Sequence, residues 1–273
     1  MLEPARPLLL VGGGKMGEAL LAGWLAQGVP AAAVRVVEPA ADRREWLTGR
    51  YRVPTVAAPD ELGVEVTPAV LLLAIKPQVM DAALPAFVAR CAADTLVLSI
   101  AAGKPIALFE RALGVDRAVV RAMPNTPAAV GRGVTVLCAN ASASASARLL
   151  AERLMAAVGI VRWVDDEELM HAVTAVSGSG PAYVFHAIEA LAAAGARVGL
   201  PVGLAMDLAR ATVTGAGELA YQSDAPAERL RADVTSPGGT TQAALVVLMA
   251  PDGLESLLAR AVAAAAQRSR ELA

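Results

Sequence analysis

The sequence predicts an α/β protein of two domains: a doubly wound, mostly parallel sheet over residues 1–164 and an all-helical domain over residues 165–273. Up to residue 164, short continuous apolar runs alternate with helical patterns, which is typical of a parallel sheet covered on both faces. Beyond it, nearly all of the chain has helical patterning, broken by clusters of Gly and Pro. A length of 273 residues is ample for two domains with hydrophobic cores.

The apolar runs and the helical patterns between them locate the elements of the first domain. Strands are expected at Pro7–Val11, Val34–Glu38, Val70–Ile75, Thr95–Ile100, Ala118–Met123, Val134–Cys138 and Ile160–Val164. Helices are expected at Met16–Gln27, Ala40–Leu47, Gln78–Ala89, Ile106–Arg111 and Ala145–Ala157. Ser144 or Ser146 is placed to cap the last of these helices, because a serine oxygen can accept a hydrogen bond from the first turn.

The helical part begins with an acidic run at residues 165–168, which suits the positive end of a helix dipole. Several of its segments, such as IEALAAAGARVGL, are apolar on nearly every side, and such a helix must be buried on all sides. A domain of this size buries such helices most readily against a second copy of itself. The sequence therefore predicts a homodimer, or a higher homo-oligomer built from dimers.

Composition and charge exclude several classes of function. A net charge of -2 without a Lys/Arg cluster gives no reason to expect nucleic-acid binding. Two cysteines, Cys91 and Cys138, suggest a reducing compartment and small buried groups. The longest charge-free run, Leu169–Ile188, contains SGSGP, which argues against a membrane span. The first apolar run is interpreted as a strand, not a signal peptide, so we expect a cytoplasmic protein without membrane contact.

Gly12, Gly14 and Gly17 have the G-x-G-x-x-G spacing and lie between a strand and an amphipathic helix. In a Rossmann-type domain these glycines permit the tight turn, the approach of a pyrophosphate and the packing of the helix on the sheet. The amides of Lys15, Met16 and Gly17 would then face the phosphates. We therefore expect a dinucleotide cofactor.

Glu38 ends the second expected strand, where a carboxylate can bind the adenosine ribose and favour NAD. Arg43 and Arg44 follow closely, and either could meet the additional phosphate of NADP. All three could also be solvated charges. The sequence leaves the choice between NADPH and NADH open.

Five further segments have specific motifs and occur in this order: VLLLAIKPQV, LVLSIAAGKPI, VVRAMPNTPAAVGRG, HAVTAVSGSGPAYVFHAIEAL and VTSPGGTTQAAL. Together they resemble pyrroline-5-carboxylate reductase, and the resemblance extends from Leu8 to about Leu258. That family reduces 1-pyrroline-5-carboxylate to L-proline with NADPH or NADH, in the last step of proline biosynthesis. Gly13 and Lys15 depart from the family's usual Ala and Asn in the glycine loop.

The resemblance implies the rest of the cofactor site. Together with the glycine loop, the expected cofactor-binding residues are Gly12, Gly14, Lys15, Met16, Gly17, Glu38, Arg43, Ala74, Ile75, Lys76, Pro77, Ala101, Ala102, Gly103 and Asn125. The added segments follow strands of one parallel sheet, whose carboxyl ends border a single crevice. Lys76 precedes a proline, so an extended conformation is expected there.

The resemblance also implies where the substrate binds. The expected substrate-binding residues are Met123, Ser177, Ser236, Gly238, Gly239, Thr240 and Thr241. Residues 238–240 offer successive amides at a helix start, which suits the substrate's carboxylate. The hydroxyl of Thr241 is the candidate catalytic group, by hydrogen bonding the ring nitrogen or donating a proton to it. Residues 177–180 form either a second turn at this site or a close helix-packing point.

The remaining polar residues do not suggest other chemistry. No metal cluster or catalytic triad is apparent, and His171 and His186 are interpreted as hydrogen-bonded packing residues. A β-hydroxyacid dehydrogenase would need a lysine in its helical domain, and none follows Val164. An NADP-binding regulatory protein without turnover is the second alternative, although the intact SPGGTT segment argues against it.

Overall fold

The computed structural model describes residues 3–63 and 66–272, which form two compact units. The first unit comprises the chain up to Gly178 together with the C-terminal segment from Ala266. The second unit is Ser179–Ala265. The sequence-based boundary at residue 164 lies at the end of the sheet. Residues 165–178 belong to the same compact unit as that sheet, because Met170 packs into its core.

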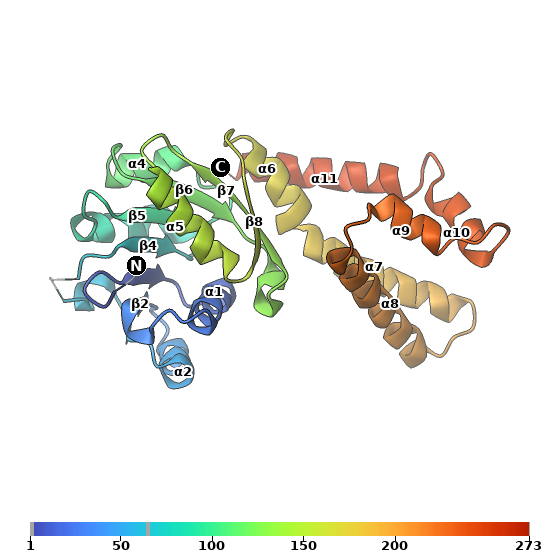
Figure 1. Ribbon diagram of the computed structural model, residues 1–273, viewed down its shortest axis with the longest axis horizontal. Coiled ribbons are helices and arrows are strands. Elements are labelled where there is room, and N and C mark those ends of the chain that lie inside the picture. The colour runs from blue at the N-terminus through green and yellow to red at the C-terminus, as the bar shows by residue number, and fades with distance from the viewer. Residues whose placement is uncertain (1–2, 64–65, 273) are drawn as a thin grey trace. The chain divides into compact units, whose positions relative to one another are not determined.

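The first unit is built on one eight-stranded sheet with the order β3-β2-β1-β4-β5-β6-β7-β8 (Figure 1). Its strands are β1 (Leu8–Val11), β2 (Val34–Val37), β3 (Thr55–Val56), β4 (Val70–Leu73), β5 (Leu96–Ser99), β6 (Val119–Met123), β7 (Gly133–Ala139) and β8 (Gly159–Trp163). Every strand expected from the sequence is present. The two-residue β3 was not predicted, because so short a strand has no periodic pattern.

All neighbouring strands pair in parallel except β6 and β7, which are antiparallel. The chain returns from β6 to β7 through a short 3-10 helix, Thr126–Val130, instead of a full crossover helix. A parallel connection would need a dozen or more residues. The mostly parallel sheet is therefore confirmed, with one reversed pair near its edge.

Alternate residues of the central strands point to opposite faces of the sheet, and both faces are buried. Leu8 and Leu10 belong to one core, which α1 (Lys15–Ala26), α2 (Ala41–Tyr51) and α5 (Ala145–Ala156) cover. Leu9 and Val11 belong to the other, which α3 (Pro77–Ala83) and α4 (Ile106–Leu113) cover. Each of these four side chains is at most 4% exposed. This two-sided burial explains why the strands are continuous apolar runs instead of alternating patterns.

The helices of the first unit agree with the predicted ones. They are α1 (Lys15–Ala26), α2 (Ala41–Tyr51), α3 (Pro77–Ala83), α4 (Ile106–Leu113), α5 (Ala145–Ala156) and α6 (Leu169–Val173), with 3-10 helices at Ala31–Ala33, Pro59–Glu61 and Leu84–Arg90. Ser144 caps α5, because its Oγ accepts the Ala147 N–H at 3.2 Å. The expected helix Gln78–Ala89 changes to 3-10 geometry at Leu84, next to Pro85.

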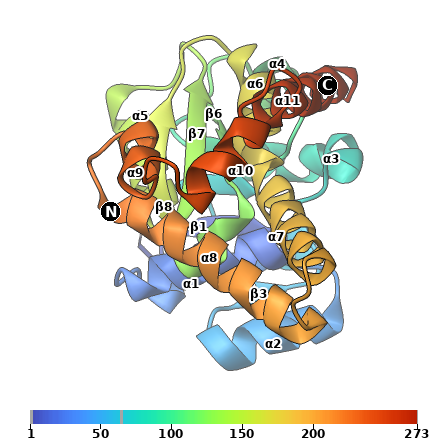
Figure 2. The ribbon, with the colours of Figure 1, turned by 90° about the vertical axis from the view of Figure 1, so that its right-hand side faces the viewer.

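The second unit is entirely helical. It comprises α7 (Gly180–Arg197), α8 (Val202–Gln222), α9 (Ala227–Asp233), α10 (Thr240–Leu248) and most of α11 (Leu254–Glu271). Helices α7 and α8 pack on one another across a short connection that contains Gly199 and Pro201 (Figure 2). In the part of the chain that the structure describes, no helix combines the length and apolar character needed to cross a membrane.

Many large apolar side chains of the second unit are exposed. Those more than half exposed are Phe185, Val198, Val202, Leu219, Tyr221, Val234, Val246, Val247, Met249 and Leu257. In the first unit, by contrast, most large apolar side chains belong to two buried cores, and those more than half exposed are Val115, Val130, Val176 and Leu272. So much exposed apolar surface on the second unit is characteristic of an interaction face, which agrees with the predicted homo-oligomer.

Candidate functional site

The glycine loop between β1 and α1 folds tightly against the end of β4. Gly12 has a φ of +101°, and a Cβ there would lie 2.6 Å from the backbone oxygen of Ala74. A Cβ on Gly17 would collide with the backbone oxygen of Gly12. These two positions therefore require glycine, for the turn and for the packing of the helix, as the sequence predicts.

Gly14 differs from its neighbours because a Cβ there would meet no atom within 4 Å. It is exposed and is the N-cap of α1, which begins at Lys15. The first N–H groups of a helix have no intrahelical acceptor, so those of Lys15 and Met16 remain available to an anion. The open space beside Gly14 and these amides fit a pyrophosphate. The Lys15 side chain is exposed.

The other expected cofactor segments lie at the same edge of the sheet. Ala74–Pro77 follows β4, Ala101–Gly103 follows β5, and Asn125 lies just after β6. Because β1, β4, β5 and β6 run in parallel, all three segments leave the edge that carries the glycine loop. The strand order reverses between β1 and β4, which is where such sheets bind ligands. Lys76 is extended before Pro77, as expected.

Asn125 joins β6, β7 and the segment that carries Ser177. It is buried, its Oδ1 accepts the Val134 N–H at 2.9 Å, and its Nδ2 donates to the backbone oxygen of Ser177 at 3.1 Å. Both ends of this side chain are thus engaged within the protein. A cofactor contact by Asn125 would therefore come most directly from its backbone.

Ser177 lies in a π-helical segment, Thr174–Gly178, which leads into the helix break expected at residues 178–181, where α7 begins at Gly180. Its hydroxyl donates to the backbone oxygen of Val173 at 2.9 Å. A Cβ on Gly178 would collide with the terminal methyl group of Met123. The structure therefore brings together two predicted substrate residues, Met123 and Ser177, through the glycine beside Ser177. Single π-turns inside helices are frequent at functional sites.

Glu167 and Arg121 support this arrangement, although the sequence did not single them out. Arg121, on β6, is 6% exposed and pairs with Glu167 at 2.5 Å. The same carboxylate oxygen accepts the Ile106 N–H at 2.8 Å, at the start of α4. Glu167 belongs to the acidic run that was predicted as a helix start. The one signal of its pairing in the sequence is Arg121 itself, because an arginine within a buried strand needs a carboxylate partner.

Glu38 contacts the glycine loop directly. Its Oε2 accepts the Gly13 N–H at 2.8 Å, and its Oε1 accepts the Ala40 N–H at 3.0 Å. Arg43 also contacts the loop, because its Nε donates to the Gly13 backbone oxygen at 2.5 Å. Arg44 donates to the backbone oxygens of Glu38 and Pro39. The predicted ribose-binding segment and the predicted phosphate-binding loop are therefore in contact.

In the second unit, the SPGGTT segment forms the turn before α10. Gly238 has a φ of +70°, a conformation that favours glycine. Its N–H donates to Oε1 of Gln242 at 2.5 Å, and the Gly239 N–H donates to the backbone oxygen of Ser236 at 3.0 Å. Two of the expected carboxylate-binding amides are thus engaged within the turn. The amides of Thr240 and Thr241 lie at the helix start, where no intrahelical acceptor exists.

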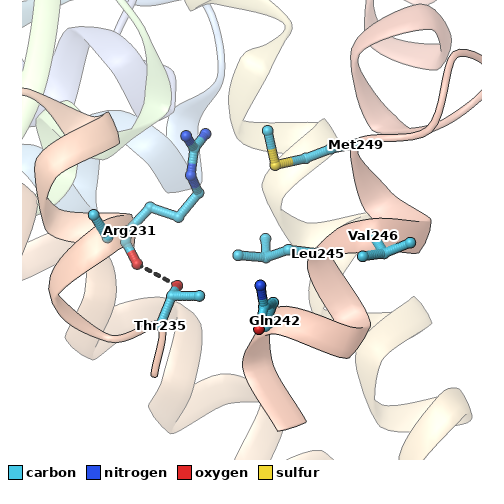
Figure 3. Close-up of a pocket in the computed structure, with 7 residues that line it drawn as sticks. Arg231, Thr235, Gln242, Leu245, Val246 and Met249 are labelled. Carbon is cyan, nitrogen blue, oxygen red and sulfur yellow. Dashed lines mark hydrogen bonds between the residues drawn. The ribbon is translucent and has the colours of Figure 1, made fainter. Parts of the chain in front are cut away.

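A groove of about 510 Å³ lies between α9 and α10 (Figure 3). Arg231 and Thr235 come from the α9 side, and Gln242, Leu245 and Met249 come from α10. The Thr235 hydroxyl donates to the backbone oxygen of Arg231 at 2.6 Å. The groove combines one cationic side chain with an apolar wall, directly beside the Gly238 turn.

The histidines and cysteines take no part in these sites. His171 is buried and lies 2.9 Å from the hydroxyl of Ser269, which confirms a packing role. His186 is also hydrogen-bonded, 3.1 Å from Glu189, but it is exposed on α7 and does not pack in the core of this chain. Burial raises the pKa values of the Cys91 and Cys138 thiols. Among the described residues, no group of three or more His, Cys, Asp or Glu side chains could hold a metal ion.

Family models match both parts of the chain. Residues 8–103 match a family described as NADP oxidoreductase, coenzyme F420-dependent, and residues 167–272 match the pyrroline-5-carboxylate reductase dimerisation family. The second match covers the helical region whose apolar side chains are exposed. It supports the homo-oligomer predicted from the sequence.

Proteins named pyrroline-5-carboxylate reductase match nearly the full length of the chain. The one from Pseudomonas aeruginosa is 43% identical, over 97% of this chain and 96% of its own length. The one from Synechocystis sp. is 44% identical, over 96% and 97%.

Solved structures agree with these relatives. A pyrroline-5-carboxylate reductase from Coxiella burnetii matches with a TM-score of 0.90 and 34% identity, over 98% of this chain and 99% of that one. A pyrroline carboxylate reductase from Plasmodium falciparum with NADP bound matches with a TM-score of 0.81 and 28% identity, over 98% of each chain. On this evidence, the chain belongs to the pyrroline-5-carboxylate reductase family.

Proposed function

We propose that this protein reduces 1-pyrroline-5-carboxylate to L-proline with NADPH or NADH, the last step of proline biosynthesis. The observation that carries the proposal is the 43% identity with a reductase of this name over nearly the full length of both chains. The open phosphate-binding loop at Gly14 supports it, because the reaction needs a bound dinucleotide.

When bound at this loop, the dinucleotide would supply a hydride to the imine carbon of the ring and would itself be oxidised. As the new C–H bond forms, the π electrons of the C=N bond move to the nitrogen, which takes up a proton. The protein's own task is mainly to position the two reactants, which can contribute roughly 7–11 kcal/mol. General acid help typically contributes about 10²–10⁴-fold, so positioning is the larger effect.

We assign the cofactor to the edge of the sheet at β1, β4, β5 and β6. Gly14 and the amides of Lys15 and Met16 would hold the pyrophosphate, and Glu38 would face the adenosine ribose. The segments Ala74–Pro77 and Ala101–Gly103 would line the rest of the cofactor. Asn125 would position Ser177, because its side chain already bonds the Ser177 backbone.

We assign the substrate's carboxylate to the turn before α10. The amides of Thr240 and Thr241 are the free donors there, while those of Gly238 and Gly239 hold the turn in shape. Thr241 is the proposed catalytic residue, whose hydroxyl would hydrogen-bond the ring nitrogen. Ser236, Met123 and Ser177 are the remaining proposed substrate contacts.

We infer a cofactor domain over residues 1–164 and a substrate-binding and dimerisation domain over residues 165–273, with residues 165–178 and the segment from Ala266 compact with the sheet of the first domain. The protein is proposed to act in the cytoplasm as a homodimer or an assembly of dimers. The exposed apolar side chains of the second unit support the dimer, since a lone copy would leave them in water.

Steady-state oxidation of NADPH and of NADH in the presence of 1-pyrroline-5-carboxylate tests the activity. We expect turnover that needs both the substrate and a dinucleotide. A protein that binds the dinucleotides but gives no turnover with either would refute the reductase and leave a nucleotide-binding regulator in its place.

A further inference from the structure

The charged side chains around the end of β2 bear on which dinucleotide the glycine loop accepts. NADPH differs from NADH by one phosphate on the adenosine ribose, and in Rossmann-type domains that ribose lies beside the end of the second strand. The residues involved are Glu38, Arg43 and Glu18, and their part in cofactor choice rests on the proposed function, because a dinucleotide must bind at Gly12–Gly17.

Glu38 holds its carboxylate against the glycine loop through two backbone amides, those of Gly13 at 2.8 Å and Ala40 at 3.0 Å. A carboxylate at this place can accept hydrogen bonds from the ribose hydroxyls. A phosphate on the same ribose would instead meet a fixed negative charge. Binding NADPH well would therefore require a nearby cation that is free to turn toward the phosphate.

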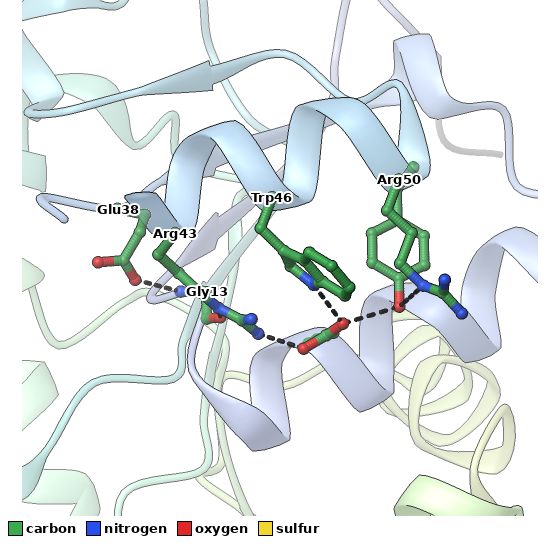
Figure 4. Close-up of polar contacts among 7 residues, drawn as sticks. Gly13, Glu38, Arg43, Trp46 and Arg50 are labelled. Atoms are coloured by element: carbon green, nitrogen blue, oxygen red, sulfur yellow. Dashed lines mark hydrogen bonds and ion pairs between the residues drawn. The ribbon is translucent and has the colours of Figure 1, made fainter. Parts of the chain in front are cut away.

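Arg43 is the nearest candidate for that cation, but it is engaged elsewhere (Figure 4). Its Nε donates to the Gly13 backbone oxygen at 2.5 Å, and its Nη2 forms an ion pair with Oε2 of Glu18 on α1. The side chains of Arg43 and Glu18 are only 26% and 22% exposed. Water therefore screens this pair less than it would screen a pair at the open surface.

The second carboxylate oxygen of Glu18 also accepts hydrogen bonds, which fix the side chain in place. Its Oε1 accepts hydrogen bonds from Nε1 of Trp46 at 2.9 Å and from the hydroxyl of Tyr51 at 3.0 Å. The Arg50 guanidinium lies over both rings, 5.7 Å from the Trp46 centroid and 5.5 Å from that of Tyr51. Turning Arg43 toward a phosphate would break its pair with a carboxylate that the rest of the cluster keeps fixed.

The charge state of Glu18 strengthens this pairing. Burial raises the pKa of Glu18, but hydrogen bonds from Trp46, Arg43 and Tyr51 together lower it below its usual value. Glu18 is therefore ionised at neutral pH and keeps its attraction for Arg43.

Arg44 is the second cation of this segment. One of its guanidinium nitrogens donates to the backbone oxygens of Glu38 at 2.9 Å and Pro39 at 2.7 Å. These contacts keep the Arg44 charge on the main chain of residues 38 and 39. A phosphate would have to compete with two carbonyl acceptors for it.

We propose that Glu18 is a specificity-determining residue of this protein. By holding Arg43, it leaves the Glu38 carboxylate unopposed beside the adenosine ribose, so that the protein binds NADH in preference to NADPH.

Equilibrium binding of NADH and NADPH to the full-length protein, without substrate, tests this proposal. The wild-type protein should bind NADH at least about tenfold more tightly, the equivalent of one charged hydrogen-bonding interaction. Glu18→Gln should tighten NADPH binding by about tenfold, because Arg43 is released, and should change NADH binding less than about twofold. Glu45→Gln, the same charge change at an exposed site on α2, is the matched control and should leave both affinities unchanged.

ADP-ribose and 2′-phospho-ADP-ribose should show the same ratio as the dinucleotides, because the cluster lies on the adenosine side. Equal or tighter binding of NADPH to the wild-type protein would overturn the proposal, whether or not Glu18→Gln folds. So would an unchanged ratio in a Glu18→Gln variant that melts like the wild type. A protein that binds neither dinucleotide would refute the proposed function itself.

Discussion

The glycine-rich turn before α1 and the one before α10 are built differently. In the first, Gly12 and Gly17 are required by backbone atoms that a Cβ would strike. In the second, a Cβ on Gly238 would meet nothing within 4 Å, and the turn is held by a single side chain, that of Gln242. The first turn is therefore fixed by the packing of the sheet, whereas the second is fixed only locally.

Gly17→Ala should have the largest effect, because the new methyl group would strike the backbone oxygen of Gly12. We expect a loss of about 1–3 kcal/mol in unfolding free energy, together with loss of NADH binding. Gly14→Ala is the matched variant, since its Cβ enters open space. It should keep its stability within about 0.5 kcal/mol but weaken NADH binding, because the methyl group takes the space proposed for the pyrophosphate. Thermal melts and fluorescence titration with NADH measure both quantities. Equal losses of stability in the two variants would contradict the difference between these glycines.

Thr241→Ala should mainly affect the chemistry, because the hydroxyl is proposed to contact the ring nitrogen. We expect kcat/KM for 1-pyrroline-5-carboxylate to fall by about tenfold to a hundredfold, with NADH and NADPH affinities nearly unchanged. Thr240→Ala changes an exposed side chain one residue earlier and serves as the control. It should lose much less of kcat/KM. A comparable loss of cofactor binding in Thr241→Ala would mean that Thr241 has been assigned to the wrong ligand.

Gly238→Ala tests the locally held turn. The substitution places an ordinary residue at a φ of +70°, which costs about 1 kcal/mol of strain, and it introduces no clash. We expect a raised KM for the substrate and unchanged NADH binding, measured by steady-state kinetics and titration. If NADH binding weakened as much as substrate binding, the two turns would not serve separate ligands.

The smallest effect should be a difference in acid sensitivity. Hydrogen bonds lower the pKa of Glu18 in the folded protein despite its burial, whereas the second turn is held by the neutral Gln242. Glu18 therefore contributes stability above its ordinary pKa of 4.5, and this contribution is lost as the pH falls through the lower value of the folded state. The difference in unfolding free energy between wild type and Glu18→Gln should be less than about 1 kcal/mol. This difference should disappear in acid. Urea unfolding at a series of pH values measures it, and a gap that widened in acid would contradict the lowered pKa.

The sequence predicted most of the sheet, because buried parallel strands are continuous apolar runs between helical patterns. It did not reveal the reversed pairing of β6 and β7, because an apolar run carries no signal of strand direction. The helix break expected at residues 178–181 lies where α7 begins at Gly180, but the π-helical turn at Thr174–Gly178 before it was not predicted. That turn depends on hydrogen bonds that residue types alone do not specify.

At the site, the spacing of Gly12, Gly14 and Gly17 predicted the loop, and the structure adds that Gly14 alone faces open space. The partnership of Glu18 with Arg43 was not predictable, because 25 residues separate them and only the packing of α1 near α2 joins them. The hydrogen bond from Gly238 to Gln242 spans only four residues. It was still not predictable, because a glutamine at that spacing is common in helices.

The contact between His171 and Ser269 links residues that are 98 positions apart, and everything from Ser179 to Ala265 is synthesised between them. On the ribosome, the sheet therefore emerges early but cannot complete its own unit until residue 269 has left the exit tunnel. His171 then stays without this partner while the helical unit is made, although domains generally fold as they emerge. The order of synthesis thus makes the last turns of α11 the closing step in the folding of the cofactor half.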